Sequence, residues 1–340
     1  MMKRFIVIFV VLSILLYGPS DSFSQNGEEG QKIWIAPNMP ADDQTLFDSQ
    51  DQWAHVQPQV QVFQFYGDYL KKTDQAILEK VMHVIKANGM VMAVEFGSFS
   101  EGECFGIKMF ILDSATISSF LQAGGTFDYL ILNAPFAHML EGGKNDCQYS
   151  PLNVALEISK YIKAVKKQHP QVKIGWSEPV HWYYLGESFT SHPSFYYGDL
   201  EEMIKTLMEQ IQKEGLQMDF FHADAPFEYS DRTPQGWEKL KHLQDLVHKH
   251  GLRFGLIYHS ESGGKLSDEA FYNNILKALE AFRKAGGQPD DTVIQSRFTY
   301  PRVLVPESQP YTFMYAVDHF LEKMNTLEEG VDEEGVLDIP

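Results

Sequence analysis

The sequence has few cysteines, little positive charge and almost no long apolar runs. Only two of its 340 residues are cysteines, Cys104 and Cys147. Neither comes directly after the N-terminal apolar segment, which argues against a lipid anchor there. Lys and Arg number 28 against 46 Asp and Glu, so the net charge is −18. Nucleic acids and anionic membranes are bound mainly through cationic residues, and this balance argues against both as partners.

The one long apolar run lies at the N-terminus, where Phe5–Tyr17 follows the basic pair Lys3-Arg4. Its 13 residues fall short of the roughly 20 that a membrane span needs. A basic start, a short apolar core and a small polar exit are typical of a secretory signal peptide. We therefore expect residues 1–25 to be removed and the protein to be secreted, whether extracellular or periplasmic. A retained N-terminal anchor is the alternative.

After the predicted signal, short apolar runs alternate with amphipathic segments of helical spacing. Strands that alternate with helices indicate a parallel sheet. Eight such units over 33–325 predict one closed (β/α)8 barrel, a fold of about 250 residues before insertions. Residues 326–340 are acidic and lack apolar periodicity, so we expect a flexible tail. The eight predicted strands are Ile33–Ala36, Val60–Tyr66, Met90–Phe96, Tyr129–Asn133, Val172–Trp176, Met218–Asp224, Leu252–Tyr258 and Thr292–Ser296.

The predicted helices start and stop at recognisable signals, such as the cap Ser150 before Pro151 and the glycine Gly251 after the sixth unit. The third unit has only a short helical pattern. Our predicted helices cover residues 73–88, 116–122, 151–168, 200–213, 234–250, 267–284 and 311–325.

In a (β/α)8 barrel the active site lies at the C-terminal ends of the strands. Acidic residues lie at or beside the C-terminal ends of the third, fifth and sixth predicted strands: Glu95, Glu178 and Asp224. A buried acid is costly without a partner or a task, so these are the candidate catalytic residues. Glycoside hydrolysis uses two carboxyl groups, about 5–5.5 Å apart in retaining enzymes and about 6.5–9.5 Å apart in inverting ones. We predict Glu178 and Asp224 as that pair, with Glu95 assisting, and the sequence leaves retention or inversion open. Glu261, one step beyond the seventh strand, is as readily a solvated loop residue.

Aromatic and hydrogen-bonding side chains accompany these acids. Sugar rings stack their C–H faces on aromatic rings while their hydroxyl groups need polar partners, so the mixture suits an oligosaccharide or polysaccharide. Packing at the barrel rim is the alternative for the aromatic residues. No cofactor is expected, and Trp34, Tyr66, Trp176 and Tyr258 are expected to wall the pocket. The predicted substrate-binding residues are Trp34, Tyr66, Asn133, Trp176, Trp182, His222, Tyr258 and His259.

The two cysteines fall in the loops after the third and fourth predicted strands. Neighbouring strands of a barrel bring these loops side by side on one face. In an oxidising compartment, Cys104 and Cys147 are therefore predicted to form a disulfide. Two free thiols are the alternative.

From the third strand to the last helix, the chain resembles a group of secreted bacterial (β/α)8 proteins of the glycoside-hydrolase type. The motifs are moderately specific in combination and weak singly. The resemblance implies a barrel that acts on carbohydrate at its C-terminal face. The matching segments are Asn133–Phe136 with Cys147, Ile174–Pro179, Phe220–Asp224, Gln295–Arg297 and Pro306–Phe313.

The chain departs from the pattern of this group at two positions. Ala134 stands where the Asn-Glu-Pro signature of the large retaining glycosidase clan has its acid/base glutamate, and Arg297 stands where an aromatic residue is expected. An alanine has no proton to give a leaving oxygen. Either another carboxyl group supplies the acid, or the protein binds sugar without cleaving it.

Three functions therefore remain open from the sequence. The first is a secreted glycoside hydrolase. The second is a non-catalytic carbohydrate-binding barrel, which Ala134 favours. The third is a metal-dependent sugar isomerase or epimerase, because Glu178, Asp224 and His259 resemble the ligand arrangement of xylose-isomerase-like barrels. Gln295 in place of a fourth acidic ligand, together with the secretion signal, argues against the third.

Overall fold

We describe the fold from a computed structural model. It describes residues 30–40, 44–96, 102–140, 142–143, 145, 147–185, 187–188 and 197–334. The predicted signal peptide and the last residues of the predicted tail lie outside these ranges. The chain divides into Met1–Gly30 and Gln31–Pro340, and the second unit contains the barrel.

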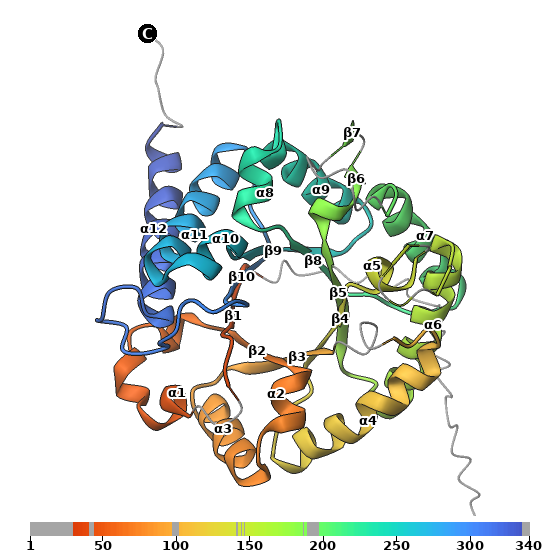
Figure 1. The fold of residues 1–340 in the computed structure, drawn as a ribbon, viewed down its shortest axis with the longest axis horizontal. Helices are drawn as coiled ribbons and strands as arrows, with labels where there is room; N and C mark the ends of the chain where they lie inside the picture. Colours follow the sequence, from red (N-terminus) through yellow and green to blue (C-terminus); the bar gives the residue numbers. More distant parts are fainter. Residues whose placement is uncertain are drawn as a thin grey trace, which may run out of the picture. The chain divides into compact units, whose positions relative to one another are not determined.

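Eight strands close into a barrel in the order β1-β10-β9-β8-β5-β4-β3-β2, and every pair of neighbours is parallel (Figure 1). This confirms the predicted single (β/α)8 barrel. The only antiparallel pair in the described part of the chain is a small hairpin, β6 (Tyr184–Leu185) with β7 (Glu187–Ser188), outside the barrel. The barrel strands are β1 (Lys32–Ala36), β2 (Val62–Tyr66), β3 (Val91–Phe96), β4 (Tyr129–Asn133), β5 (Lys173–Pro179), β8 (Phe220–Asp224), β9 (Arg253–Tyr258) and β10 (Asp291–Gln295).

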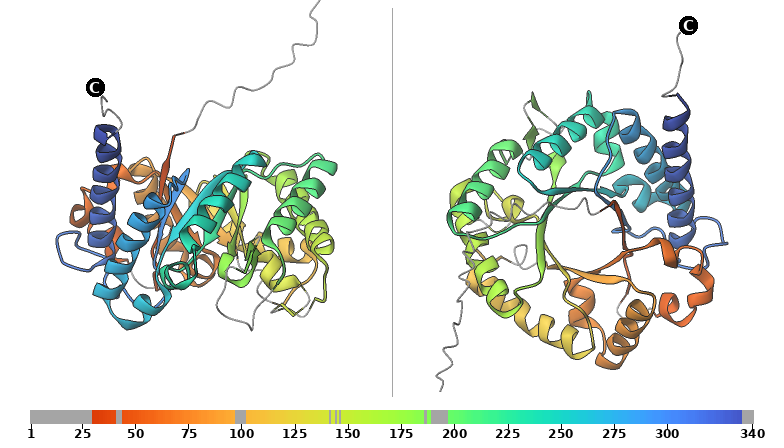
Figure 2. Two further views of the ribbon diagram at one scale, coloured as in Figure 1. Left: turned by 90° about the horizontal axis from the view of Figure 1, so that it is seen from above. Right: turned by 180° about the vertical axis from the view of Figure 1, so that it is seen from behind.

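Helices surround the barrel, and the views from the front and from behind show the same closed ring (Figures 1 and 2). None of the helices in the described ranges combines the length and apolar character needed to cross a bilayer. The long helices are α3 (Gln75–Ala87), α4 (Gly106–Gln122), α6 (Pro151–Gln168), α7 (Leu200–Lys213), α9 (Gly236–Lys249), α11 (Asp268–Lys284) and α12 (Phe313–Glu334). The short ones are α1 (Thr45–Asp48), α2 (Gly67–Lys72), α5 (Pro135–Met139), α8 (Phe227–Arg232) and α10 (Glu261–Leu266), with 3₁₀ turns η1 (Gln50–Trp53), η2 (Gln57–Gln59) and η4 (Val180–Trp182).

Two helix predictions need correction. The third unit holds a full helix, α4 (Gly106–Gln122), and not a short one. Its buried face includes the polar residues Asp113 and Thr116, while Ile107 and Ile111 are exposed, so the apolar spacing is blurred. The last helix, α12, runs to Glu334 and not to residue 325, so the predicted tail begins as helix.

Side chains inside the barrel form their own apolar cluster, separate from the core between sheet and helices. Trp34 lies against the rings of Tyr129 and Phe220, with centroids 4.8 and 5.7 Å apart. Two glycines leave room for large neighbours: a Cβ on Gly175 would lie 2.3 Å from the Phe220 ring, and one on Gly255 would lie 2.2 Å from the His222 ring. The lower barrel is therefore packed, and an open site can exist only at its mouth.

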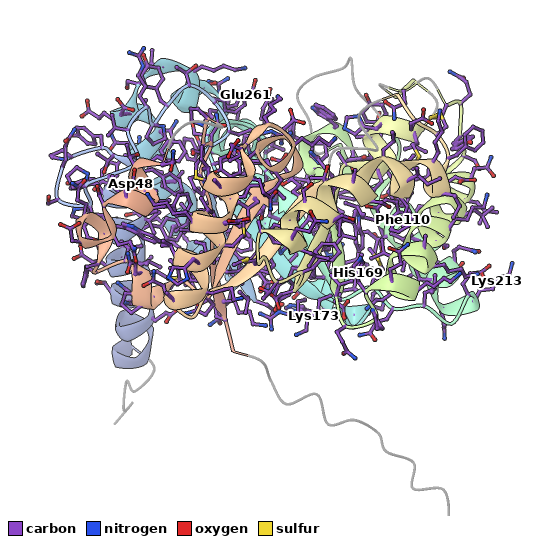
Figure 3. The ribbon with its side chains drawn as sticks, turned by 90° about the horizontal axis from the view of Figure 1, so that it is seen from below. Asp48, Phe110, His169, Lys173, Lys213 and Glu261 are labelled. Atoms are coloured by element: carbon purple, nitrogen blue, oxygen red, sulfur yellow. A yellow bond between two sulfur atoms is a disulfide. The ribbon has the colours of Figure 1, made fainter. Side chains whose placement is uncertain are left out.

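The short helices α2, α5, α8 and α10 follow directly at, or within two residues of, the C-terminal ends of their strands. They build the C-terminal face of the barrel. Figure 3 shows Glu261, which begins α10, and Lys173, which begins β5, at opposite ends of the barrel. This arrangement places the strand-end residues of the sequence prediction on one face.

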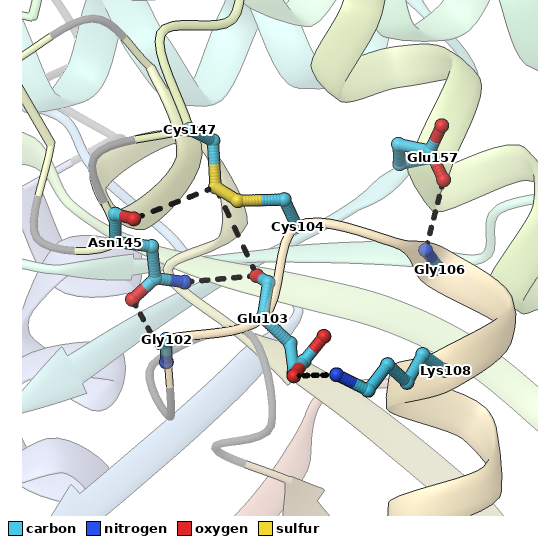
Figure 4. Close-up of a disulfide and its surroundings, with 8 residues drawn as sticks. All are labelled: Gly102, Glu103, Cys104, Gly106, Lys108, Asn145, Cys147 and Glu157. Carbon is cyan, nitrogen blue, oxygen red and sulfur yellow. Dashed lines mark hydrogen bonds and ion pairs between the residues drawn. A yellow bond between two sulfur atoms is a disulfide. The ribbon is translucent and has the colours of Figure 1, made fainter.

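The loops after β3 and β4 are joined by the Cys104–Cys147 disulfide, whose Cα atoms lie 5.7 Å apart (Figure 4). The disulfide was predicted from the sequence. Asn145 reinforces the link: its amide nitrogen donates to the Glu103 carbonyl at 3.1 Å, and its amide oxygen accepts from the Gly102 N–H at 3.2 Å. The two loops are thus held together on the C-terminal face.

Candidate active site

A pocket of about 340 Å³ opens at the C-terminal ends of β4, β5, β8, β9 and β10. We call it the mouth pocket. Charged residues and histidines converge there beside aromatic rings, and convergent polar groups next to apolar faces are a feature of small-molecule sites. Its lining residues are Asn133, Ala134, His138, Pro179, His181, Trp182, Asp224, Pro226, His259, Glu261, Arg297 and Phe298.

Asp224 ends β8 in the mouth pocket, and both its carboxylate oxygens have partners. Oδ1 lies 2.6 Å from Nε2 of His259, and Oδ2 accepts from Nη1 of Arg297 at 3.0 Å. Burial by itself would raise the pKa of Asp224, but His259 and Arg297 outweigh it and hold the pKa well below its ordinary value. Asp224 is therefore an ionised carboxylate at neutral pH.

Glu95 is the penultimate residue of β3 and is buried inside the barrel mouth. Its Oε2 accepts a hydrogen bond from the Gln64 side chain at 2.7 Å. Burial raises the pKa of Glu95 from 4.5 to about 7, although Arg297 and Gln64 lower it in part and Asp224 raises it further. A large share of Glu95 is thus protonated near neutral pH, in contrast to Asp224.

Arg297 follows β10, and its electrostatic partners are Asp224, Glu95 and Tyr66. Its side chain is 41% exposed and lines the mouth pocket. The hydroxyl group of Tyr66 donates to the Ser296 carbonyl at 3.3 Å, which holds Tyr66 beside the same loop. One cation therefore acts on both carboxyl groups. The sequence marked Arg297 only as a departure from an aromatic position.

His181 and two aromatic rings also belong to the pocket wall. His181 stacks on Tyr229 with centroids 4.2 Å apart, and burial lowers the pKa of His181 to about 4, so it is neutral. Within the described residues, Nδ1 of His181 and Nδ1 of His259 have no hydrogen-bond partner. Trp182 and Phe298 add aromatic faces to the lining. The pocket can thus offer both polar groups and rings to a ligand.

Glu261 also lines the mouth pocket, although the sequence left it as readily a solvated loop residue. Its carboxylate pairs with Lys265 at 2.6 Å within α10. Glu228 fixes the start of this helix by accepting from the Glu261 N–H at 3.1 Å and the Gly263 N–H at 2.9 Å. Glu261 is therefore at the site but has its own cation.

The structure separates Glu178 from the other two predicted acids. Successive side chains of a strand point to opposite faces. Asp224 pairs in register with Pro179 and with Ile257, which belongs to the cluster inside the barrel. Glu178 pairs instead with Ala223, which faces the helices. The expectation that Glu178 and Asp224 converge in one pocket is therefore wrong.

Most of the predicted aromatic wall also lies elsewhere. Trp34 is buried deep inside the barrel, whereas Trp176 and Tyr258 face the helices, where they contact Phe221 and Phe320. His222 is likewise buried below the mouth, with its Nε2 3.4 Å from Asp291 Oδ2. None of these side chains lines the mouth pocket. Of the predicted substrate-binding set, the lining residues are Asn133, Trp182 and His259.

Ala134 lines the pocket in a left-handed backbone conformation, with φ 47° and ψ 46°. Its position in the wall carries no carboxyl group. The metal ligands expected for the isomerase alternative, Glu178, Asp224 and His259, do not lie on one side of the sheet, because Glu178 faces the helices. Across the described ranges, no group of three or more His, Cys, Asp or Glu side chains is arranged to hold a metal ion.

No family model matches the chain, and no curated protein matches it. Solved structures do share its fold. A Bacteroides thetaiotaomicron protein, named provisionally as an alpha-L-fucosidase, has a TM-score of 0.52 at 12% identity, over 88% of this chain and 96% of that one. The intracellular xylanase of Thermoanaerobacterium saccharolyticum, solved with xylotetraose, has a TM-score of 0.51 at 9% identity, over 78% and 85%. At such identities the likeness shows the fold alone, so function has to be argued from the site.

Proposed function

We propose that the protein is a secreted, glycoside-hydrolase-like barrel that binds a carbohydrate in the mouth pocket and cleaves a glycosidic bond with Asp224 and Glu95. The observation that carries this proposal is that two carboxyl groups acting on the Arg297 guanidinium have pKa values shifted in opposite directions. The pKa of Asp224 is held low, so Asp224 is ionised, whereas the pKa of Glu95 is raised to about 7. Carboxyl groups whose pKa values are pushed apart are what acid and base roles in one site require.

The roles follow from the protonation states. Protonated Glu95 would donate its proton to the leaving glycosidic oxygen, while ionised Asp224 would act on the anomeric carbon, directly or through a water molecule. Arg297 would stabilise the charge that Glu95 acquires as it gives up its proton. In this scheme Glu95 supplies the proton that Ala134 cannot.

The remaining lining residues would bind the sugar. Trp182 and Phe298 would stack on its C–H faces, and Asn133 and His181 would hydrogen-bond its hydroxyl groups. The disulfide is compatible with an exported protein. The strongly acidic chain suits a neutral glycan better than a polyanionic one.

Non-catalytic carbohydrate binding is the second candidate, and three observations favour it. Ala134 occupies the wall where an acid would serve, and Glu95 is not among the residues that line the mouth pocket. Both oxygens of Asp224 are already bonded. Such a barrel would bind a sugar in the mouth pocket without hydrolysing it.

Reducing-sugar release from a panel of neutral polysaccharides, with binding measured by calorimetry, tests both candidates. We expect Glu95→Gln and Asp224→Asn each to lower the rate by about 10²–10⁴-fold. Glu261→Gln should have a much smaller effect, and Glu238→Gln, an exposed carboxyl on α9, serves as the matched control. Binding without cleavage of any glycan would favour the second candidate. If the protein neither binds nor cleaves any glycan of the panel, both candidates are refuted.

A further inference from the structure

Glu178 occupies an unusual position behind the wall of the mouth pocket. It lies on the helix-facing side of β5 with 0% exposure, and three donors converge on its carboxylate. Oε1 accepts from the Phe136 N–H at 2.9 Å, and Oε2 accepts from the Ala137 N–H at 3.4 Å. The hydroxyl group of Tyr183 donates to Oε2 at 2.6 Å.

These donors belong to two separate segments of the pocket wall. Phe136 and Ala137 lie in the first turn of α5, the helix that carries the lining residue His138 and directly follows Ala134. Tyr183 follows directly after Trp182, a lining residue of the η4 turn. One carboxylate therefore joins the β4–α5 wall to the β5–η4 wall.

The β4–α5 wall needs such support because of its backbone. Ala134 adopts a left-handed conformation, which is sterically unfavourable for an L-residue with a Cβ. Strained residues of this kind persist only where the surroundings fix them. The Ala134 N–H donates to the Ser177 carbonyl at 2.8 Å, and Glu178 binds the next two available N–H groups, since Pro135 has none.

We propose that Glu178 is a positioning residue, whose buried carboxyl group fixes the two wall segments of the mouth pocket relative to each other and so couples the shape of the site to pH. This inference deepens the proposed function, because it concerns regulation of the same pocket. Three hydrogen bonds hold the carboxyl group in place, while burial favours its protonated form. Opening of the wall exposes Glu178 to water and lets it ionise, so a rising pH loosens the wall.

The surroundings set the pH at which this happens. Burial raises the pKa of Glu178 to about 8, against the lowering effect of Tyr183 and the two N–H groups, and Asp224 adds a smaller rise. Tyr183 and Tyr197 are the other titratable groups that act on it, and burial raises the pKa of each, so both stay neutral in this range. Glu178 is thus the group that changes charge as the pH rises through about 8.

Hydrogen–deuterium exchange of the full-length protein tests this positioning role without a sugar. After correction for intrinsic rates, protection of the backbone amides in 136–140 and 180–185 should fall by up to about tenfold per pH unit as the pH rises toward about 8, and should level off above that pH, because opening lets the buried acid ionise. In Glu178→Gln that fall should vanish, because a glutamine does not titrate. Glu228→Gln, which alters the parallel contact at α10, should leave 136–140 and its pH response unchanged.

Equal protection in Glu178→Gln and wild type would overturn the proposal. If Glu178→Gln does not fold, Tyr183→Phe takes its place: Tyr183 lowers the pKa of Glu178, so its removal should move the midpoint of the protection change upward. An unmoved midpoint would also overturn it. Should the wild type bind no carbohydrate, the proposed function fails, whereas the exchange data still decide whether Glu178 positions the wall.

Discussion

Reduction of the Cys104–Cys147 disulfide offers a quantitative test of how the C-terminal face is held. The bond closes a loop with a sequence separation of 43 residues that spans α4, β4 and α5. The chain-entropy relation for a loop of that length gives a stabilisation of about 4 kcal/mol at 25 °C, mainly because the bond restricts the unfolded chain. Unfolding of a domain of roughly 300 residues carries an entropy of about 0.6 kcal/mol per degree. The expected fall in Tm is therefore about 6 °C.

Urea unfolding followed by circular dichroism, with and without dithiothreitol, measures the effect. The oxidised protein should have a higher transition midpoint than the reduced one. A Cys104→Ser/Cys147→Ser variant should match the reduced protein and should not respond to the reductant. Asn145 still bridges the two loops in the reduced protein, so the native barrel should persist. A difference below about 1 kcal/mol would show that the disulfide does not restrict the unfolded chain as the loop-entropy argument requires.

Three further outcomes follow from the mouth of the barrel. If Glu95 is the acid, the pH–rate profile of hydrolysis should have a limb that falls as the pH rises through about 7. Because Arg297 lowers the pKa of Glu95, Arg297→Gln should move that limb to higher pH, and an unmoved limb would exclude Glu95. Because folding raises this pKa from 4.5 to about 7, the native state keeps the proton longer and stability falls as the pH rises between those values, by about 3 kcal/mol at most. Glu95→Gln should flatten that slope in urea titrations, and an unchanged slope would contradict the assigned burial. Gly255→Ala should destabilise the fold by about 1–3 kcal/mol, since the new Cβ would meet the His222 ring, and a neutral effect would mean that the barrel interior is loosely packed.

The order and kind of elements could be predicted from the sequence because they depend on local pattern. Each barrel strand is a short apolar run bounded by turns, and the eight-fold alternation with helices leaves few topologies. The disulfide followed from the same reasoning, since adjacent parallel strands bring their following loops together. Only the last part of α4 was predicted, because Ile107 and Ile111 are exposed while Asp113 is buried, which removes the periodicity that local reasoning uses.

The sequence by itself thus determined the barrel and the face that carries the site, together with Asp224, Glu95, His259, Trp182 and Asn133 as residues near strand ends. It could not determine which way each strand-end side chain points. A strand of a parallel barrel is buried on both faces, so apolar residues occur on both and no polar alternation marks the inside. Only the closed sheet, with its fixed register, turns Asp224 inward and Glu178 outward, and brings Arg297 within electrostatic reach of Asp224 and Glu95, which are far apart in the sequence. That choice depends on packing across the whole barrel, which no single segment encodes.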